Sequence, residues 1–237
     1  LWICDTDNNR IKKLRLSGLS FVAHYGDLNI STGAPIAGAG DTGFDSPEDI
    51  VYSADHGLLF ISDTDNNRIK LHRASDMRYV NQITGLSAPR GLAVNRQYLW
   101  CADSGNSRIV RIKLSDLSIE QATGSNGTGN QQLASPRQIA YDPHERVIYV
   151  ADTGNSRLLK WDSHGLMNYR DKVIGLTSPI GVTHRDHILY VVTATAITAR
   201  AASTLVSQAT VGSSGVGNAN ISAGRYIMAH RNVLFLT

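Results

Sequence analysis

The chain has 237 residues, of which 42% are hydrophobic and 18% are charged, and its net charge is +3. This balance is typical of a globular protein and excludes a disordered chain, a collagen-like chain and a coiled coil. No stretch approaches the roughly 18 apolar residues of a membrane-spanning helix. The 2 Cys form no disulfide-rich scaffold, and they show no metal-ligand spacing.

The predicted elements belong to a repeat that runs along the chain. Four copies are clear: LWICDTDNNRIKKL, LFISDTDNNRIKL, LWCADSGNSRIVRI and IYVADTGNSRLLK, which start at Leu1, Leu59, Leu99 and Ile148. A fifth copy starts at Leu189 without the acidic and Asn positions, and a sixth, LFLT, starts at Leu234. Spacings of about 40 to 60 residues favour propeller blades over leucine-rich, ankyrin or tetratricopeptide arrays.

Each copy predicts four short strands. In the third copy, an apolar run over residues 90–95 is opened by Pro89, and a second run over 99–103 ends in an acid. Residues 108–114 then alternate between apolar and polar, and 118–123 form a weaker run. Gly, Asn, Asp and Ser cluster between the runs and supply the turns. Four strands per ~45-residue unit predict the sheet of one propeller blade.

This pattern strongly resembles the NHL repeat. The resemblance rests on Pro-x-Gly-φ-Ala-φ at residues 89–94, followed by an aromatic strand that ends in Ala-Asp-Thr-x-Asn-x-Arg. The segment GAGDTGF at residues 38–44 is similar to bacterial and teneurin-type variants. The resemblance implies that the Pro-led strand is innermost and lines a central channel. The aromatic strand, the Arg-led strand and the weak strand follow outwards.

We therefore expect an all-β fold, a single β-propeller of four-stranded antiparallel blades. Six blades are favoured, with five as the alternative. The expected blades cover residues 1–26 (partial), 47–85, 88–123, 135–175, 178–211 and 224–237 (partial). Because the first blade lacks its inner strand and the last its outer half, we expect the natural polypeptide to continue beyond this chain, with further domains.

The Asp-Thr-x-Asn-x-Arg element favours a structural role, because an element shared by the blades serves folding rather than a single site. The acids are expected to accept backbone hydrogen bonds, the Asn residues to adopt the left-handed conformation, and the Arg residues to lie against the acid or the neighbouring blade. These residues are Asp5, Asp63, Asp103 and Asp152; Asn8, Asn66, Asn106 and Asn155; and Arg10, Arg68, Arg108 and Arg157. Calcium is not expected, because the loop is short and contains an Arg.

No catalytic residue, metal site or cofactor is predicted. The turn histidines are expected to be exposed and too far apart to share a metal: His56, His144, His187 and His230. The densest group, residues 184–187, is explained by its polar turn. The chain also lacks a Gly-x-Ser-x-Gly elbow and a phosphate-binding loop. A relative of the NHL fold, the peptidyl-hydroxyglycine amidating lyase, holds zinc with three histidines, so a metal-dependent propeller lyase or hydrolase is one alternative.

One candidate binding site follows the Pro of each inner strand. These positions hold Glu48, Arg90, Arg137 and, by alignment, Arg225, and in a propeller they surround the channel mouth. Several Arg around one funnel indicate a site for a carboxylate, a phosphate or an acidic side chain. The alternative is that these Arg are solvated or pair with the Glu.

Long loops precede three of the inner strands and emerge on the same face as the Asp-Thr turns. Each loop carries an N-x-Ser/Thr triplet, at Asn29, Asn126 and Asn220. These would be glycosylation acceptors only in a secreted eukaryotic chain. Loops on a rigid scaffold are where binding normally resides.

We expect a non-catalytic interaction scaffold that binds a protein, a glycan or another part of its own polypeptide on this loop face. An RNA-binding NHL domain is a further alternative, although a net charge of +3 is low for a surface that binds the phosphate backbone of a nucleic acid. Nucleic acid and membrane insertion are not expected. The resemblance favours an extracellular, cell-surface or virion-exterior location.

Overall fold

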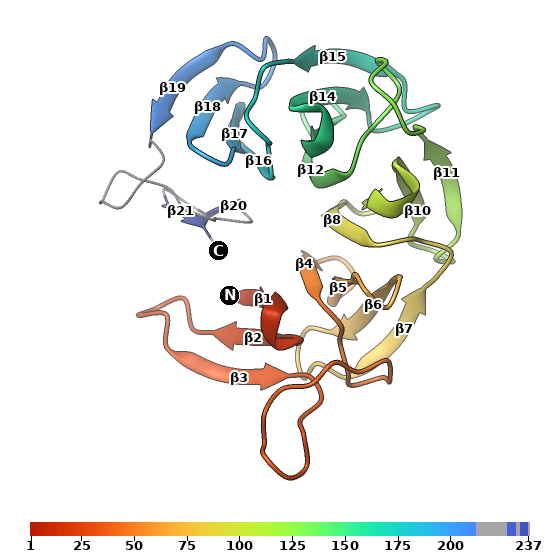
Figure 1. The fold of residues 1–237 in the computed structure, drawn as a ribbon, viewed down its shortest axis with the longest axis vertical. Helices are drawn as coiled ribbons and strands as arrows, with labels where there is room; N and C mark the ends of the chain where they lie inside the picture. The colour runs from red at the N-terminus through yellow and green to blue at the C-terminus, as the bar shows by residue number, and fades with distance from the viewer. Residues whose placement is uncertain (212–226, 231–232, 237) are drawn as a thin grey trace. The chain divides into compact units, whose positions relative to one another are not determined.

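The computed structural model describes residues 1–211, 227–230 and 233–236. The strands of this part of the chain form six antiparallel sheets (Figure 1). Four sheets have four strands each, one has three strands and one has two. Successive small sheets of this kind are the blades of a β-propeller, so the predicted all-β fold class is confirmed. No helix of the described residues is long and apolar enough to pass through a membrane.

The strands of the first three sheets follow one another along the chain. They are β1 (Trp2–Asp5), β2 (Arg10–Leu14) and β3 (Phe21–Tyr25); β4 (Pro47–Ser53), β5 (Leu58–Asp63), β6 (Arg68–Arg73) and β7 (Tyr79–Ile83); and β8 (Pro89–Val94), β9 (Tyr98–Asp103), β10 (Arg108–Lys113) and β11 (Ile119–Thr123). Short 3-10 helices follow β1 and β9, namely η1 (Thr6–Asn8) and η2 (Ser104–Asn106).

The remaining sheets repeat this arrangement. They comprise β12 (Pro136–Asp142), β13 (Val147–Asp152), β14 (Arg157–Asp162) and β15 (Tyr169–Val173); β16 (Gly181–Arg185), β17 (Ile188–Val192), β18 (Ile197–Ala201) and β19 (Ser207–Val211); and β20 (Ile227–His230) with β21 (Val233–Leu236). A third 3-10 helix, η3 (Thr153–Asn155), follows β13. The terminal sheets, β1–β3 and β20–β21, together hold one strand more than a four-stranded blade, so the choice between six and five blades stays a prediction.

The chain divides into two compact units. The first comprises Leu1–Asn106 and Arg111–Glu120, and the second comprises Ser107–Val110 and Gln121–Thr237. Within the first unit β4 contacts β8, and within the second β12 contacts β16. These neighbouring sheets of a unit therefore meet through their first strands, and the strands of each complete sheet follow one another in chain order, as predicted.

The aromatic residues of the second strands pack one sheet against the next. Phe60, Trp100 and Tyr149 are fully buried or nearly so. In the second unit, the Tyr149 hydroxyl donates a hydrogen bond to the Ala202 carbonyl of the neighbouring sheet, at 2.8 Å. Burial of a large aromatic side chain removes on the order of 150–250 Å² from water, so this column is a main source of stability.

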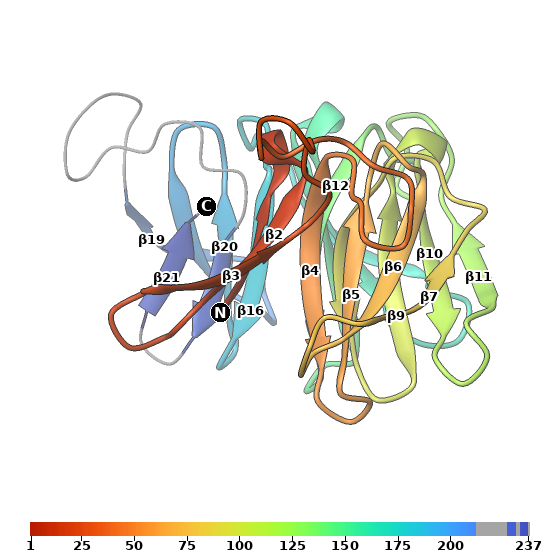
Figure 2. The same ribbon diagram turned by 90° about the horizontal axis from the view of Figure 1, so that it is seen from below.

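The connections of each unit lie at two opposite ends of its sheets. One end carries the turns of the Asp-Thr-x-Asn-x-Arg element, here called motif turns, together with the long loops. In the first unit, Figure 2 shows the loop between β3 and β4 and the 3-10 helix after β1 at the same end of the strands. We call this the loop end, because it carries the candidate site.

Candidate functional site

The backbone of the motif turn departs from the sequence expectation at one position. The Asn of Asp-Thr-x-Asn ends the 3-10 helix, and the left-handed residue is the next one along the chain. The residues with positive φ are Asn9 (51°), Asn67 (55°), Ser107 (51°) and Ser156 (52°). The expectation that Asn8 and its equivalents are left-handed is therefore wrong. Both Asn and Ser adopt this conformation here, so no single residue type marks the left-handed position in the sequence.

The motif acid binds both its own Arg and the loop that precedes the sheet. Asp63 is fully buried, and its carboxylate accepts hydrogen bonds from the Asp45 backbone N–H and from Arg68 Nε, both at 2.7 Å. Antiparallel pairing of β5 with β6 places Asp63 directly opposite Arg68. In the second unit, Asp152 accepts equivalent bonds from Ala134 N–H and Arg157 Nε.

The first copy, whose Asp5 and Arg10 are half-buried, shows how the charges of this arrangement balance. Burial alone would raise the pKa of Asp5, but hydrogen bonds from Lys12, Asn8 and Arg10 lower that pKa to about 2. Asp5 is therefore a carboxylate at neutral pH and is held by two cations. The element binds its own cations, which agrees with a structural role.

Two further positions of the motif link one sheet to the next, the residue after the Asp and the residue after the Asn, and the sequence analysis did not single them out. Thr64 Oγ1 donates to the Pro89 carbonyl at 2.8 Å, and Thr153 Oγ1 donates to the Pro179 carbonyl at 2.7 Å. Asn67 Oδ1 accepts the Ala88 N–H at 2.8 Å. Thr recurs after Asp in three of the clear copies, and that recurrence was the available signal.

The first long loop, residues 26–46, is held by two buried cations. Arg68 Nη1 and Nη2 donate to the carbonyls of residues 39 and 40, and Lys70 Nζ donates to the carbonyls of residues 40, 41 and 43 at 2.6–3.0 Å. Lys70 has no exposed surface, and its Nζ also lies 4.5 Å from the centroid of the Phe44 ring. Burial, with a smaller effect of the Arg68 charge, lowers the pKa of Lys70 to about 8.

Glycines allow the same loop to close on itself. A Cβ at Gly38 would lie 2.1 Å from Asp27 Oδ2, and one at Gly43 would lie 2.3 Å from that atom. The other carboxylate oxygen of Asp27 accepts the Thr42 hydroxyl at 2.7 Å. The Gly-rich GAGDTGF segment is therefore required by the approach of Asp27 to the backbone.

The second long loop, residues 124–135, is held by Arg157 in the second unit. Its guanidinium donates to the carbonyls of Thr128, Gly129 and Gln132 at 2.6–2.9 Å. Asn155 Nδ2 donates to the Gly127 carbonyl at 2.8 Å. The motif Arg thus fixes the long loop of its own sheet in both units.

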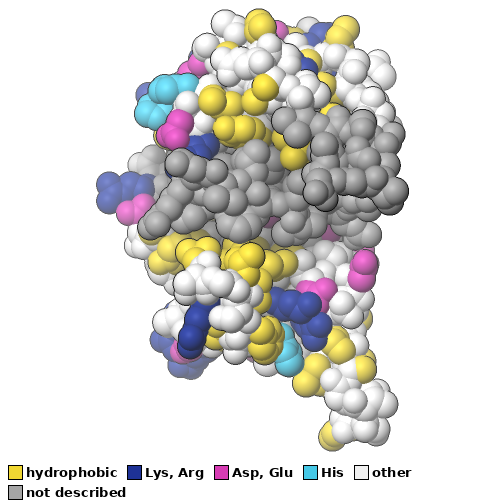
Figure 3. Space-filling model, turned by 90° about the vertical axis from the view of Figure 1, so that its left-hand side faces the viewer, with side chains coloured by type: hydrophobic (Ala, Val, Ile, Leu, Met, Phe, Trp, Pro, Cys, Tyr) yellow, Lys and Arg dark blue, Asp and Glu magenta, His cyan; other side chains and the backbone are white. Residues whose placement is uncertain are grey.

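An arm projects from the first long loop. We call residues 27–37 the arm; in Figure 1 it extends away from the sheets of the first unit, between β3 and β4. Its apolar side chains Leu28, Ile30 and Ile36 are 45%, 102% and 41% exposed. In Figure 3, the projection at lower right is white and yellow, without Lys, Arg, Asp or Glu colours at its tip.

The predicted glycosylation acceptors differ in their surroundings. Asn29 and Asn126 are both exposed, whereas Asn220 lies outside the described residues. Asn29 Oδ1 accepts the backbone N–H groups of Ser31 and Thr32, both at 3.0 Å. Their modification stays a prediction.

Of the predicted channel-mouth residues, the structure brings Glu48 and Arg90 together. Arg90 Nη1 lies 2.8 Å from Glu48 Oε1, and the Glu48 side chain is largely buried. Both residues, like Arg137, sit where the register of the first strand shifts after its Pro. Arg225 lies outside the described residues. The pair of Arg90 with Glu48 corresponds to the alternative to an anion site, in which an Arg of the channel mouth pairs with the Glu.

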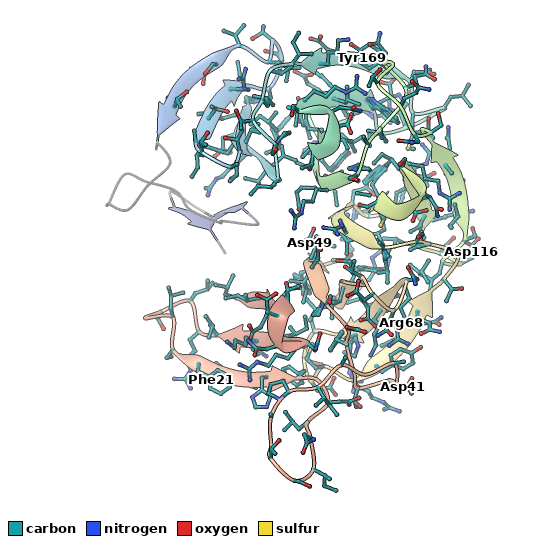
Figure 4. The ribbon with its side chains drawn as sticks, in the orientation of Figure 1. Phe21, Asp41, Asp49, Arg68, Asp116 and Tyr169 are labelled. Atoms are coloured by element: carbon teal, nitrogen blue, oxygen red, sulfur yellow. The ribbon has the colours of Figure 1, made fainter. Side chains whose placement is uncertain are left out.

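The neighbouring acid on β4 is also engaged. Asp49, labelled beside β4 in Figure 4, accepts the Leu92 N–H of β8 at 2.7 Å through Oδ2. Glu48 pairs with Arg90, and Asp49 adds a second negative charge on β4, which weakens the case for an anion site there.

The histidine expectation needs a correction. His144 and His187 are exposed as expected, but their ring centroids lie 4.6 Å apart, because the turns of two neighbouring sheets lie side by side. The His184 side chain is buried, with Nε2 3.2 Å from Asp142 Oδ2. Burial, supported by the charges of His144 and His187 and opposed by Asp142, lowers the pKa of His184. Among the described residues, no group of three or more His, Cys, Asp or Glu has a geometry that could hold a metal ion.

These sheets define a protein of the β-propeller class. Neither a protein-family model nor a curated protein matches the sequence.

Solved structures share the fold at low sequence identity. The propeller of a nidogen–laminin complex has a TM-score of 0.62 and 18% identity, and the match covers 88% of this chain and 78% of that chain. Streptogramin B lyase has a TM-score of 0.70 and 15% identity, with 100% and 72% covered. The hydrazine synthase of Kuenenia stuttgartiensis has a TM-score of 0.60 and 15% identity, with 77% and 52% covered. At these identities the likeness shows the fold alone, and this fold serves both binding proteins and enzymes.

Proposed function

We propose that the chain is a non-catalytic propeller of NHL type that binds a partner at its loop end. The observation that carries this proposal is the attachment of both long loops by buried cations. Arg68, Lys70 and Arg157 donate to loop carbonyls, and most side chains of residues 28–42 and 125–131 are exposed. Loops already fixed in one conformation lose less conformational entropy on binding, which favours affinity.

The chemistry of the loop end supports binding rather than catalysis. Asp63 and Asp152 are fully buried, and each carboxylate is bound to a backbone N–H and to an Arg. Groups held in this way are supports for the backbone, whereas a general acid or base needs access to its substrate. The repeated Asp…Asn…Arg arrangement supports the NHL-type assignment, because the Asn and the Arg side chains donate to the motif Asp in the same way from one copy to the next.

A protein is the partner that these features favour. The nidogen–laminin structure shows a propeller of this fold in a complex with another protein. Fixed loops that display mixed polar and apolar side chains fit a protein surface, as in other scaffolds that bind through loops.

Site-specific cross-linking tests the location of this binding. A photoreactive amino acid is placed at Thr32 or Asn126 at the loop end, and at His56 or His164 at the opposite end; all four positions are exposed. The full chain is irradiated in an extract of its source, and each cross-linked protein is then purified and titrated against the chain. We expect cross-links and direct binding from the loop-end positions. Equal cross-linking from the opposite end, or binding that survives exchange of both long loops for short Gly-Ser links, would contradict the proposal.

A further inference from the structure

We infer that the arm is the anchor of the interaction, and that it inserts into an apolar pocket of a partner protein whose rim carries Lys and Arg. This inference rests on the proposed function and names the class of partner.

The first observation is the apolar surface of the arm. Single exposed hydrophobic residues are ordinary, but Leu28, Ile30 and Ile36 project from one short segment, and Ile30 is exposed over its whole surface. Aliphatic side chains offer no hydrogen bond, so a concave apolar site is what such a tip fits. A flat sugar ring would instead require an exposed aromatic side chain.

A second group of exposed apolar residues in the same unit has a different explanation. Leu19, in the turn before β3, is 49% exposed, whereas Met77, in the corresponding turn before β7, is buried against Ile11 and Leu59. In the second sheet, therefore, the turn that corresponds to the Leu19 turn is covered by the packing of one sheet on another. The arm is an outgrowth of a loop, and sheet packing does not account for its apolar tip.

The conformation of the arm is fixed by its own hydrogen bonds. Leu28 and Pro35 form a β-bridge, and the Asn29 N–H donates to the Ala34 carbonyl at 2.7 Å. The Gly33 N–H donates back to the Asn29 carbonyl at 2.8 Å, and Gly33 has the positive φ of 68° that this tight turn needs. At its base, Asp27 is bound to Thr42. The arm is thus ordered before it binds, and its tip holds no charge.

The charged residues around the arm indicate which charge the surface of the partner should carry. Between Arg15 and Arg68 the sequence holds no Lys or Arg, while Asp41 and Asp65 are exposed. Arg68 and Lys70 are buried and donate inwards to the loop. Of the cations on β2, the strand paired with β3, Arg10 and Lys12 are held by Asp5, and Lys13 lies over the Trp2 ring. Arg15 lies in the turn that precedes β3. A basic rim is attracted to these acids, whereas RNA and anionic lipid are repelled.

A library of random dodecapeptides displayed on phage serves as the probe. Selection is carried out on the full wild-type chain, and the recovered peptides are synthesised and titrated. We expect sequences that combine aliphatic or aromatic residues with Lys or Arg. The Ile30→Ser variant should bind them at least about tenfold more weakly, with an unchanged melting temperature because the side chain is fully exposed. The matched control is Ile174→Ser, which removes an exposed Ile of the second unit and should bind as the wild type does.

The charge is tested with Asp41→Asn. This variant should lose about two- to threefold in affinity at low salt, and the difference should vanish near 0.5 M salt because of screening. Acidic or purely polar peptides, equal binding to Ile30→Ser, or no selected peptide would each overturn the inference. Binding of single-stranded RNA or of phosphatidylserine vesicles that depends on Ile30 would also overturn it.

The two proposals fail in different ways. If partners cross-link from Asn126 but bind Ile30→Ser normally, the loop end binds its partner and the arm is not the anchor. If peptides bind through Ile30 while no natural partner meets the loop end, the arm is a binding element and the proposed function is wrong.

Discussion

Arg68 Nε lies 2.7 Å from Asp63 Oδ2 at the loop end of the second sheet, and both side chains are largely shielded from water. The same Arg also donates to carbonyls of the first long loop. Arg68→Ala leaves a buried carboxylate without its cation, and such a loss costs about 3–5 kcal/mol. We expect a decrease of that size in the free energy of unfolding, measured by urea denaturation.

A surface pair provides the control for this measurement. Arg73 pairs with Asp76 in the turn after β6, and both side chains are about half exposed. Arg73→Ala should leave the urea midpoint nearly unchanged, because water screens exposed pairs. Similar midpoints for Arg68→Ala and Arg73→Ala would show that the motif Arg does not support the fold.

Because Lys70 is buried, we expect the free energy of unfolding to rise with pH in the alkaline range. Its pKa is about 8 in the folded chain, against 10.5 for an unperturbed Lys. Between these values the unfolded chain binds more protons, so deprotonation favours the folded state, and this contribution is lost as pH falls through 8. The free energy of unfolding of the wild type, relative to Lys70→Met, should rise by at most about 1.4 kcal/mol per pH unit in this window. Parallel pH profiles for the two proteins would contradict the burial of a charged amine.

The repeat pattern allowed prediction of the strands and their order because both depend on local alternation and on turn residues. Antiparallel pairing across a short turn puts Asp63 opposite Arg68, which is one of the two placements that the sequence left open for the Arg. Lys70 could not be found in this way. The same position of the repeat holds Lys12 in the first sheet, Val110 in the third and Leu159 in the fourth, and Lys12 binds Asp5 instead of a loop. The pattern alone therefore does not mark this position as one that holds a loop.

The histidine contact shows a second limit of the sequence. His144 and His187 are more than 40 residues apart in the chain, and their contact depends on the packing of one sheet on the next. The arm illustrates a third limit. Its composition predicted a loop, but only the hydrogen bonds that Asn29 accepts from Ser31 and Asp27 accepts from Thr42 show that it is ordered.

The structure gives a physical reason for the residue type at the third position of the motif, and this reason leads to a further prediction. This position is Asp in two copies and Gly in the other two. A Cβ at Gly105 would lie 2.3 Å from Ser87 Oγ and 2.9 Å from the Ser87 carbonyl oxygen. Gly105→Ala should therefore lower the free energy of unfolding by about 1–3 kcal/mol. Gly40→Ala is the control, because nothing lies within 4 Å of its added methyl group. Equal melting temperatures for both variants would refute the close approach.

The burial of His184 predicts a loss of stability in mild acid. Its imidazole faces Asp142 and the ring of Tyr149, and His144 and His187 lie nearby on the adjoining turns. Since its pKa is lowered in the folded chain, the unfolded chain binds the extra proton first as pH falls below 6.5. The free energy of unfolding should decrease over this range, and His184→Gln should flatten the profile. His164→Gln, at an exposed turn, should retain the wild-type slope. If His184→Gln instead keeps that slope, another group governs the acid response, and the ion pair with Asp142 outweighs burial at this site.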